Sequence, residues 1–444
     1  MPTNANLAEP FCPHFGPCGG CQLQNLTYAA QLSDKAAKLQ TLLDATGLAL
    51  PELQLHASPP LAYRNRIRLT LAVADGQLRA GYIRTAEQPD EHGGFLPITQ
   101  CPIAAPILWR ATEAFLALIN QHRATWLNNP QLTPDQLELF ATTEDAPAEA
   151  RLQLSLYLRT GLKNIPKQLT ADFTSLCNSL REHIPELTGA GIFLLPTLSA
   201  QRSRRNEQPR PGPTWGSPGL MYSISGTTYW IPRGAFFQVN RFLLPELLAL
   251  TTASRTGQLE RFHSKSMRSD RRSRGFLSKK TTLHTISSGE SHCETALAWD
   301  LYAGVGLFSR ALAARFAQVT AVEIAEPAVT ALASTKLTNL RAVKATTLDF
   351  LRAAVIERDH PDLIVLDPPR SGAGREVCEL LGRVAAPTLV YVSCSPEILP
   401  TDLTTLAAAG YSVAELHLVD LFPQTSHIET VAILTRAKPS VRIQ

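Results

Sequence analysis

The chain has 444 residues, of which 44% are hydrophobic and 18% are charged, and its formal net charge is +4. This length allows two or three domains with cores of their own, and the composition is that of a globular chain rather than a disordered one. No run of about 18 apolar residues is present, and the first residues lack a secretory leader, so we expect a cytoplasmic chain with reduced thiols and no membrane-spanning helix.

Three cysteines lie close together near the start of the chain, in the stretch CPHFGPCGGCQLQ. Crowded thiols in a reducing compartment indicate a metal site. A fourth ligand has to come from a distant segment, and Cys101 in ITQCPI is the best-placed candidate, because the other cysteines lie in expected helices or in an irregular stretch. The spacing is compatible with zinc and with an iron–sulfur cluster. The clustered cysteines are Cys12, Cys18 and Cys21.

Residues 1–235 are expected to form a mixed α+β region that carries the cysteine site. Apolar residues at helical spacing predict helices, and alternating apolar and polar residues predict strands. An Asp-Gly pair at 75–76 marks a hairpin turn. The helices are expected over 28–48 and 106–120, a hairpin over 62–83, a strand over 151–159 and a second hairpin over 221–232.

The positive charge is concentrated in polar stretches of the chain. Residues 255–293 hold nine Lys or Arg and three acidic residues, a net charge of +6, and residues 202–210 hold four Arg and one Glu. In neither stretch do apolar residues recur at the spacing of a helix or a strand, so both are expected to be loops, and 255–293 is expected to be an insertion. Basic loops are most often only solvated, but they also bind phosphate backbones.

Residues 236–444 predict the second domain. After a helix over about 241–253 and the basic loop, strand and helix patterns alternate regularly to the last apolar strand. This alternation is typical of a parallel, doubly wound sheet with helices on both faces. The expected fold class is therefore α/β, with a Rossmann-like domain that follows the α+β region.

Glycines and a carboxylate at strand ends indicate a nucleoside-binding site. In DLYAGVGLF a strand ends in a loop with Gly304 and Gly306, which let a ligand approach the backbone. Glu323 ends the next strand, seventeen residues after Gly306, where a carboxylate accepts hydrogen bonds from ribose hydroxyls. The alternative is a structural tight turn and a surface carboxylate.

Three further strand ends carry reactive groups. Asp367 follows a buried strand in VLDPPR, Cys394 ends a strand in YVSCSP, and Glu429 precedes the last strand in HIETVAIL. A cysteine after an apolar run is often a small core residue, but the Ser-Pro turn after Cys394 favours a thiol that points into a pocket. Glu429 is either a solvated carboxylate or a base that faces the same pocket.

Five motifs together resemble the RNA uracil-5-methyltransferases, which use S-adenosylmethionine to make 5-methyluridine in tRNA or ribosomal RNA. Their order matches that of the family, and the resemblance extends from Cys12 to about Leu434. It implies that residues 236–444 form the methyltransferase domain. The motifs are FFQVN (236–240), DLYAGVG (300–306), DPPR (367–370), SCSP (393–396) and HIETV (427–431).

The resemblance implies a role for each reactive residue. Cys394 is implied to be the nucleophile that adds to C6 of uracil and makes C5 carbanion-like. Glu429 is implied to be the base that removes the C5 proton, so that the thiol can leave. Four residues are implied to line the S-adenosylmethionine site, with Glu323 on the ribose and Tyr302 near the glycine loop. The four are Gln238, Tyr302, Glu323 and Asp367.

The cysteine pattern resembles the iron–sulfur branch of the family, which modifies ribosomal RNA. The resemblance implies a structural or RNA-positioning 4Fe–4S cluster, because methyl transfer needs no electron, and it favours 23S rRNA over tRNA as substrate. Members of this branch commonly carry a small β-barrel RNA-binding domain before the cluster, which we expect to be absent here. The implied cluster ligands are Cys12, Cys18, Cys21 and Cys101.

RNA contacts are then expected from three basic segments of a chain that is expected to be a monomer. In AYRNRIR, alternate arginines share one face of a strand: Arg64, Arg66 and Arg68. The other two segments are the basic loops at 202–210 and 255–293. Neutralising the nine basic residues of 255–293 is expected to weaken RNA binding and to flatten its salt dependence.

Some positions depart from the family pattern. Leu307 stands where some members have Asn, and Thr346 stands where many have an acid near the adenine, a place that Asp349 fills only if the loop shifts. These departures support the alternative of a cluster-bearing RNA-binding protein with a degenerate methyltransferase domain. A methyltransferase of exocyclic amines is disfavoured, because Arg370 replaces its base-stacking aromatic residue and Cys394 would have no use.

Overall fold

The computed structural model leaves the two basic loops almost entirely outside the residues that it describes. The expectation that 202–210 and 255–293 bind RNA therefore stays a prediction. No helix in the described part of the chain is both long enough and apolar enough to cross a membrane. The described residues are 6–83, 94–129, 132–142, 149–161, 164–196, 209–252 and 293–436.

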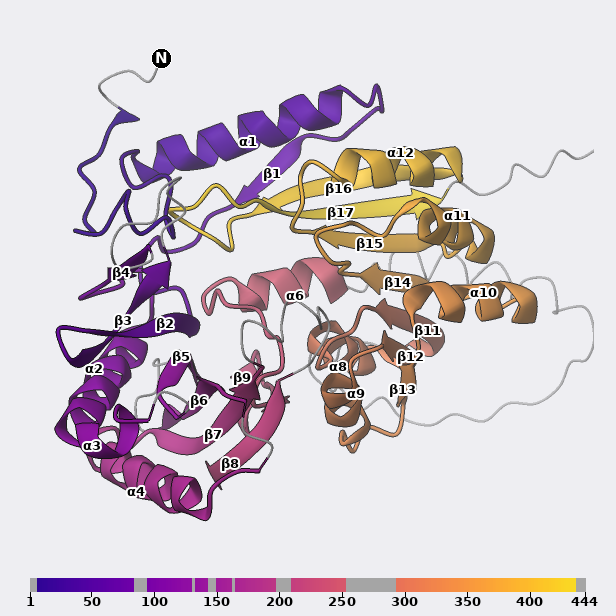
Figure 1. Cartoon of the computed structure of the whole chain (residues 1–444). Helices are drawn as coiled ribbons and strands as arrows, with labels where there is room; N and C mark the ends of the chain where they lie inside the picture. The colour runs from indigo at the N-terminus through magenta and orange to yellow at the C-terminus, as the bar shows by residue number, and fades with distance from the viewer. Residues whose placement is uncertain are drawn as a thin grey trace, which may run out of the picture.

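The alternating second half of the chain supplies seven strands of an eight-stranded sheet, which confirms the expected α/β class (Figure 1). Its neighbouring strands are parallel except for β17, which runs antiparallel to both β15 and β16. The order across the sheet is β1 (Leu53–His56), β16 (Tyr411–Val419), β17 (Glu429–Arg436), β15 (Thr388–Ser393), β14 (Leu363–Leu366), β11 (Cys293–Leu301), β12 (Phe316–Glu323) and β13 (Leu340–Lys344).

Helices cover both faces of this sheet, as a doubly wound fold requires. One apolar core joins the sheet to the helices α6, α8 and α9 and to a two-stranded ribbon, and a second core joins its other face to α1, α10, α11 and α12. The bounds are α6 (Leu244–Thr252), α8 (Leu307–Ala313), α9 (Glu326–Ala333), α1 (Tyr28–Asp44), α10 (Thr347–Glu357), α11 (Arg375–Val384) and α12 (Leu399–Ala408), with the ribbon formed by β9 (Gly219–Ile224) and β10 (Thr227–Pro232).

The first half of the chain forms a mixed seven-stranded sheet whose one face is covered by helices (Figure 1). The hairpin at 62–83 turns at Asp75 and Gly76, both with positive φ, as an Asp-Gly turn of this type requires. The order is β4 (Phe95–Pro97), β3 (Gln77–Ile83), β2 (Arg66–Ala74), β5 (Pro134–Ala141), β6 (Leu152–Arg159), β7 (Leu187–Leu195) and β8 (Arg210–Gly216), and the helices are α2 (Pro106–Gln121), α3 (Arg123–Trp126) and α4 (Lys167–His183).

The N-terminal helix and first strand pack on the C-terminal sheet rather than on the seven-stranded one. β1 pairs in parallel with β16, and Leu39 and Leu43 of α1 are fully buried in the same core as Leu416 and Leu418. Figure 1 shows α1 lying along the edge of the sheet formed by β1 and β16. A boundary at 235/236 stays a prediction, but residues 28–56 complete the α/β layer by their packing.

Candidate active site

The ends of five strands of the eight-stranded sheet bring the candidate residues to one edge. Tyr302 follows β11, Asp367 follows β14 and Cys394 follows β15, while Glu323 is the last residue of β12. These four strands are parallel, so their carboxyl ends meet at one edge of the sheet, where ligands of doubly wound folds bind. β17 is antiparallel, and its first residue, Glu429, therefore lies at that edge too.

The register between β15 and β17 makes Cys394 and Glu429 neighbours. Ser393 pairs with Thr430 in this antiparallel ladder. Continuing the ladder by one residue on each strand brings the thiol next to the carboxylate. A nucleophile and a base that act on adjacent atoms of one ring need such proximity.

A cavity of about 460 Å³ opens at this edge of the sheet. Five of the six residues for which we expected a catalytic or cofactor role line it. The sixth, Glu323, is not among the described residues that line the cavity. The complete lining is Phe236, Gln238, Tyr302, Asp367, Pro368, Pro369, Arg370, Cys394, Phe422, His427 and Glu429.

Burial and the nearby carboxylates favour the protonated thiol of Cys394. Burial and then the neighbouring carboxylates of Glu429 and Asp367 together raise its pKa to about 11, whereas Arg370 acts to lower it. A thiolate is the reactive form of cysteine. Among the cavity residues, Arg370 is thus the group that favours the nucleophilic form.

A buried carboxyl group, Glu429, and a half-buried one, Asp367, lie near the thiol. Glu429 is 2% exposed, and among the described residues its Oε1 has no hydrogen-bond partner. Burial and then the charge of Asp367 raise the pKa of Glu429 well above its usual range, while Arg370 lowers it. Burial raises the pKa of Asp367 to about 7. The hydrogen bond that the Gln238 amide donates to Asp367 over 3.4 Å acts in the opposite direction and lowers this pKa. A carboxylate with a raised pKa is a stronger base.

The glycine loop after β11 has room for a ligand at one of its two glycines. A Cβ on Gly304 would meet nothing within 4 Å, so the backbone there is open to a ligand. Gly306 has another role: with φ of 88°, a Cβ there would lie 2.5 Å from Leu332 Cδ2, so glycine is required by packing. Asp300, buried beneath the loop, accepts hydrogen bonds from the backbone and hydroxyl of Ser309 in α8.

Glu323 holds the glycine loop in place. Its Oε2 accepts a hydrogen bond from the Gly304 amide over 2.9 Å, and its Oε1 accepts from the amides of Ile324 and Ala325 over 2.7 Å each. A carboxylate has about four lone-pair sites, so these bonds leave acceptor capacity for a hydroxyl. The role on a ribose stays a prediction.

The two departures from the family pattern have structural explanations. Leu307 is buried and belongs to the core between the sheet and α8, so its apolar character suits its position. Thr346 caps α10: its hydroxyl accepts the Asp349 amide over 3.0 Å and donates to the Asp349 carboxylate over 2.7 Å. Both side chains are thus engaged at the helix start.

Three aromatic residues of the cavity wall were not predicted as site residues from the sequence. Phe236 is 69% exposed at the cavity, and Phe422 and His427 meet edge to face with ring centroids 5.7 Å apart. His427 begins the HIETV motif and Phe236 begins FFQVN, so membership of these motifs could have pointed to both residues, whereas Phe422 lies in neither motif. Aromatic side chains at such a site offer surfaces on which bases stack.

The four clustered cysteines meet around a second cavity, of about 240 Å³. Cys12, Cys18 and Cys21 line it together with Cys101, which lies far away in the sequence. His14 joins the two segments, since its Nε2 accepts a hydrogen bond from the Thr99 amide over 2.9 Å. The four-thiol donor set fits an iron–sulfur cluster.

Within the described ranges, no group of three or more His, Cys, Asp or Glu side chains is placed to hold one metal ion. Four thiols around a shared cavity leave space for a larger inorganic group between them. Zinc and an iron–sulfur cluster at these thiols both stay predictions.

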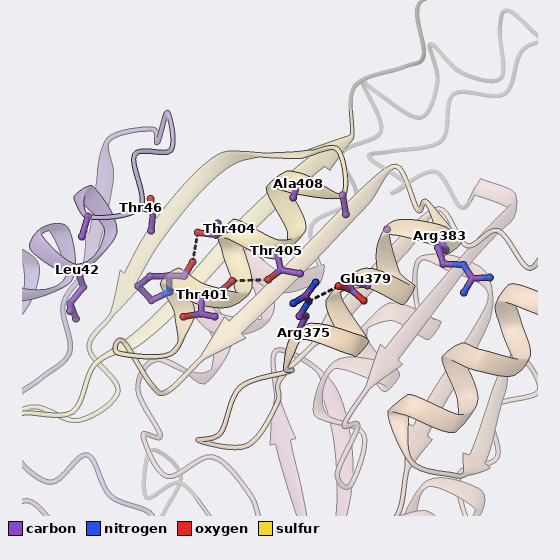
Figure 2. A pocket seen from close by; sticks show the side chains of 13 residues that line it. Leu42, Thr46, Arg375, Glu379, Arg383, Thr401, Thr404, Thr405 and Ala408 are labelled. Carbon is purple, nitrogen blue, oxygen red and sulfur yellow. Dashed lines mark hydrogen bonds and ion pairs between the residues drawn. The ribbon is translucent and has the colours of Figure 1, made fainter.

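A larger groove of about 990 Å³ lies between the end of α1 and the helices α11 and α12 (Figure 2). None of the residues that line the catalytic cavity lines it. Several of its polar side chains pair within their own helices: Arg375 with Glu379, and the hydroxyls of Thr404 and Thr405 with carbonyls one turn back. This groove offers no reactive group for catalysis.

The chain is similar in sequence to RNA uracil methyltransferases, which agrees with the residues that line the cavity. Residues 290–437 match the family described as tRNA (Uracil-5-)-methyltransferase. A 23S rRNA (uracil(1939)-C(5))-methyltransferase RlmD of Chromohalobacter salexigens is 29% identical over 100% of this chain and 79% of its own length. An RlmD of Pectobacterium carotovorum is 27% identical over 96% of this chain and 80% of its own length.

A solved structure supports the fold. The tRNA (uracil-54, C5)-methyltransferase of Pyrococcus abyssi, in complex with S-adenosyl-L-homocysteine, superposes with a TM-score of 0.62 at 20% identity, over 95% of this chain and 86% of its own. That likeness concerns the fold, while the sequence matches concern the family. Together with the strand-end cysteine and carboxylates, the matches make the chain similar to the S-adenosylmethionine-dependent RNA (uracil-C5) methyltransferases.

Proposed function

We propose that the chain transfers a methyl group from S-adenosylmethionine to C5 of a specific uridine in RNA, through a covalent bond between Cys394 and C6 of the uracil ring. The observation that carries the proposal is the juxtaposition of Cys394 and Glu429 in one cavity at the sheet edge. A base methylator that acts on an exocyclic amine needs no thiol at this place.

Cys394 would activate the ring. Its thiolate forms a bond to C6, and the electron pair of the C5=C6 bond moves onto C5 and the adjacent carbonyl as an enolate. C5 then has the nucleophilic character that uracil lacks. Arg370 supports this step because its charge lowers the pKa of the thiol.

Glu429 would complete the reaction. Its carboxylate takes the proton from C5, the C–H electron pair restores the C5=C6 bond, and the S–C6 bond breaks so that the thiolate leaves. The buried Oε1, without a partner among the described residues, is available to receive that proton. A raised pKa makes Glu429 a better base for a carbon acid than an exposed carboxylate.

The methyl donor would lie between the glycine loop and the cavity. When bound, S-adenosylmethionine supplies an electrophilic methyl group. Gln238, Tyr302 and Asp367 line the cavity, and Glu323 fixes the loop at Gly304. We assign these four residues to the donor site because they surround the open backbone of Gly304 and the adjoining cavity.

The RNA is proposed to be 23S rRNA, because two of the relatives named above are 23S rRNA methyltransferases and align with almost the whole chain. The exposed ring of Phe236 at the cavity mouth is a candidate stacking surface for a base. A monomeric, cytoplasmic chain stays a prediction.

The proposal is tested with RNA that carries tritium at C5 of uridine and with S-adenosylmethionine that carries a labelled methyl group. We expect tritium release and label in 5-methyluridine in equal amounts, with 23S rRNA fragments preferred over tRNA transcripts. Label on an exocyclic amine without tritium release would favour the amine methyltransferase. Binding of RNA and cofactor without turnover would favour the degenerate RNA-binding protein.

Replacing Arg370 and Asp367 in turn should shift the reactivity of Cys394 in opposite directions. Arg370→Gln removes the charge that lowers the thiol pKa, so its pKa rises and alkylation at a fixed pH slows. Asp367→Asn removes a charge that raises the pKa, so alkylation accelerates. The measurement is the iodoacetamide reaction of the Cys394 peptide by mass spectrometry between about pH 7 and pH 10. Equal rates in both variants would contradict the assigned electrostatics.

We also propose that Cys12, Cys18, Cys21 and Cys101 hold a 4Fe–4S cluster in a structural role. Their convergence on one cavity from two distant segments supports the proposal. Arg64 and Arg68 line this cavity, so a cluster there would stabilise β2, which carries Arg68, and the segment just before it, which carries Arg64.

Cys101→Ser should abolish the cluster. Anaerobically purified wild-type chain is expected to contain iron and acid-labile sulfide in equal amounts, and the variant should contain less than about a tenth of both, because a cluster of this kind needs all four thiolates. Cys177→Ser is the control, since Cys177 is buried in α4 outside this cavity. Zinc in place of iron, or full iron content in Cys101→Ser, would overturn the assignment.

A further inference from the structure

The segment 420–427 joins β16 to β17 and carries two residues of the catalytic cavity. Phe422 and His427 line the cavity from this segment. The segment lies between the two strands, so the pairing of β16 with β17 does not determine its conformation. Gln424 is 3% exposed and has φ of 69°, a region that residues other than glycine rarely adopt. Such a conformation persists only when surrounding contacts hold it.

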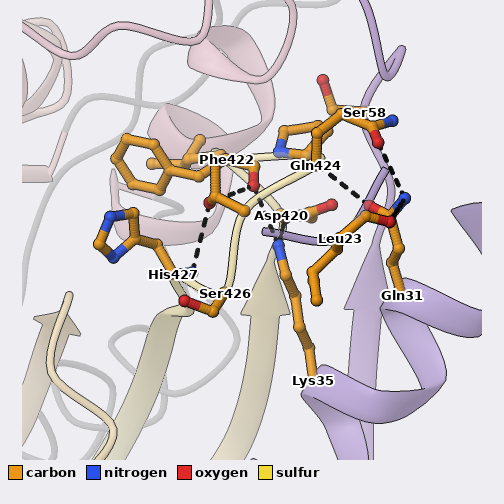
Figure 3. A network of polar contacts seen from close by, with 12 residues as sticks. Leu23, Gln31, Lys35, Ser58, Asp420, Phe422, Gln424, Ser426 and His427 are labelled. Carbon is orange, nitrogen blue, oxygen red and sulfur yellow. Dashed lines mark hydrogen bonds and ion pairs between the residues drawn. The ribbon is translucent and has the colours of Figure 1, made fainter. Parts of the chain in front are cut away.

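Lys35 of α1 holds the first part of the segment. Its ammonium group donates to Asp420 Oδ1 over 2.6 Å and to the carbonyl oxygen of Phe422 over 3.0 Å. The side chains of Lys35 and Asp420 are 3% and 0% exposed. The Tyr28 hydroxyl donates to Asp420 Oδ2 over 2.9 Å, so both carboxylate oxygens are used. Figure 3 shows Lys35 reaching up from the helix to this segment.

Gln31, one turn before Lys35, holds Gln424. Its Oε1 accepts the Gln424 amide over 3.0 Å, and its Nε2 donates to Gln424 Oε1 over 2.9 Å and to the carbonyl of Leu23 over 2.9 Å (Figure 3). The carbonyl of Gln424 accepts the amides of Gln22 and Leu23, each over 3.0 Å. Gln22 directly follows Cys21, so the cysteine segment also takes part in these contacts.

We propose that Gln31 and Lys35 are positioning residues of the methyltransferase site, and that they hold Phe422 and His427 as the aromatic wall against which the target uracil stacks. The inference rests on the proposed function and adds a substrate-positioning role for a helix that lies about 390 residues away in sequence. Neither side chain lines the cavity among its described residues. They act through the backbone of 420–427.

Lys35→Met should separate chemistry from cofactor binding. We expect the single-turnover rate at saturating RNA to fall by about 10- to 100-fold, because displacement of a substrate-positioning group by about 1 Å has an effect of that size. The dissociation constant for S-adenosylhomocysteine, measured by calorimetry, should stay within about twofold, because the donor-site residues are untouched.

Lys38→Met is the matched control. Lys38 lies on the same helix and pairs with Glu397, but the two side chains are 50% and 56% exposed, and such pairs contribute little. We expect wild-type rate and cofactor affinity. A wild-type rate in folded Lys35→Met, or a parallel loss of cofactor affinity and rate, would overturn the inference.

The buried carboxylate left in Lys35→Met is a risk to folding, because an unpaired buried charge is strongly destabilising. Lys35→Met/Asp420→Asn removes both charges and still releases the Phe422 carbonyl, so the same rate loss is expected from it. A wild-type rate in the folded double variant would contradict the inference.

Hydrogen exchange separates this inference from the proposed function. Amides of 421–427 should exchange faster in Lys35→Met than in Lys38→Met, whether or not the chain methylates uridine. A wild-type chain that leaves uridine unmodified contradicts the proposed function alone. Equal exchange in the two variants contradicts the positioning role alone.

Discussion

Cys394→Ala is expected to lose 5-methyluridine formation by at least about 10⁴-fold, since removal of a catalytic nucleophile has effects of this size or larger. The alanine variant keeps the cavity walls but has no group that can add to C6, and uracil C5 then stays too weak a nucleophile to accept a methyl group. The measurement is tritium release from C5-labelled RNA under single-turnover conditions. Affinity for S-adenosylhomocysteine should be retained, because the donor-site residues are unchanged.

Cys378→Ala is the matched control for this variant. Cys378 lies in the same half of the chain, fully buried in α11, and does not line the catalytic cavity in the described structure. A small loss of packing is expected there, without loss of catalysis. Substantial turnover in Cys394→Ala would contradict the covalent mechanism, and equal loss in Cys378→Ala would indicate that folding rather than chemistry is affected.

The positions of Tyr302, Asp367 and Cys394 could be predicted from the sequence because the carboxyl ends of parallel strands lie at the same edge of a sheet. An apolar strand followed by a helix leaves its carboxyl end at the ligand-binding edge, and each of these residues directly follows such a strand. Glu429 was harder to place, because it begins a strand. It reaches the same edge only because β17 is antiparallel, and local sequence patterns do not determine strand direction.

Contacts between distant segments could not be predicted. Gln31 and Lys35 look like solvent-facing residues of a helix, and they are buried only because the 420–427 segment lies on them. Glu323 was expected to bind ribose, but no local pattern indicates that its carboxylate also accepts a hydrogen bond from the Gly304 amide. Cys101 could be selected by elimination, whereas its place in the cysteine cavity depends on how the chain folds between the two segments.

Glu429→Gln is expected to accumulate a covalent protein–RNA adduct. Cys394 can still add to C6 and C5 can still be methylated, but the amide cannot take the C5 proton, so the S–C6 bond does not break. Turnover should fall by at least about 10³-fold, within the range assigned to loss of general base catalysis together with product release. Denaturing electrophoresis with labelled RNA should show a band of reduced mobility that contains both protein and label.

Two further variants make this result specific. Cys394→Ala/Glu429→Gln should show no adduct, because the bond to RNA requires the thiol. Glu326→Gln changes an exposed carboxylate of α9 outside the cavity lining that the structure describes, and it should turn over without a trapped intermediate. An adduct that persists without Cys394 would assign the covalent bond to another residue. Free product release from Glu429→Gln at the wild-type rate would show that a different base removes the proton, even with Glu429 buried beside the thiol.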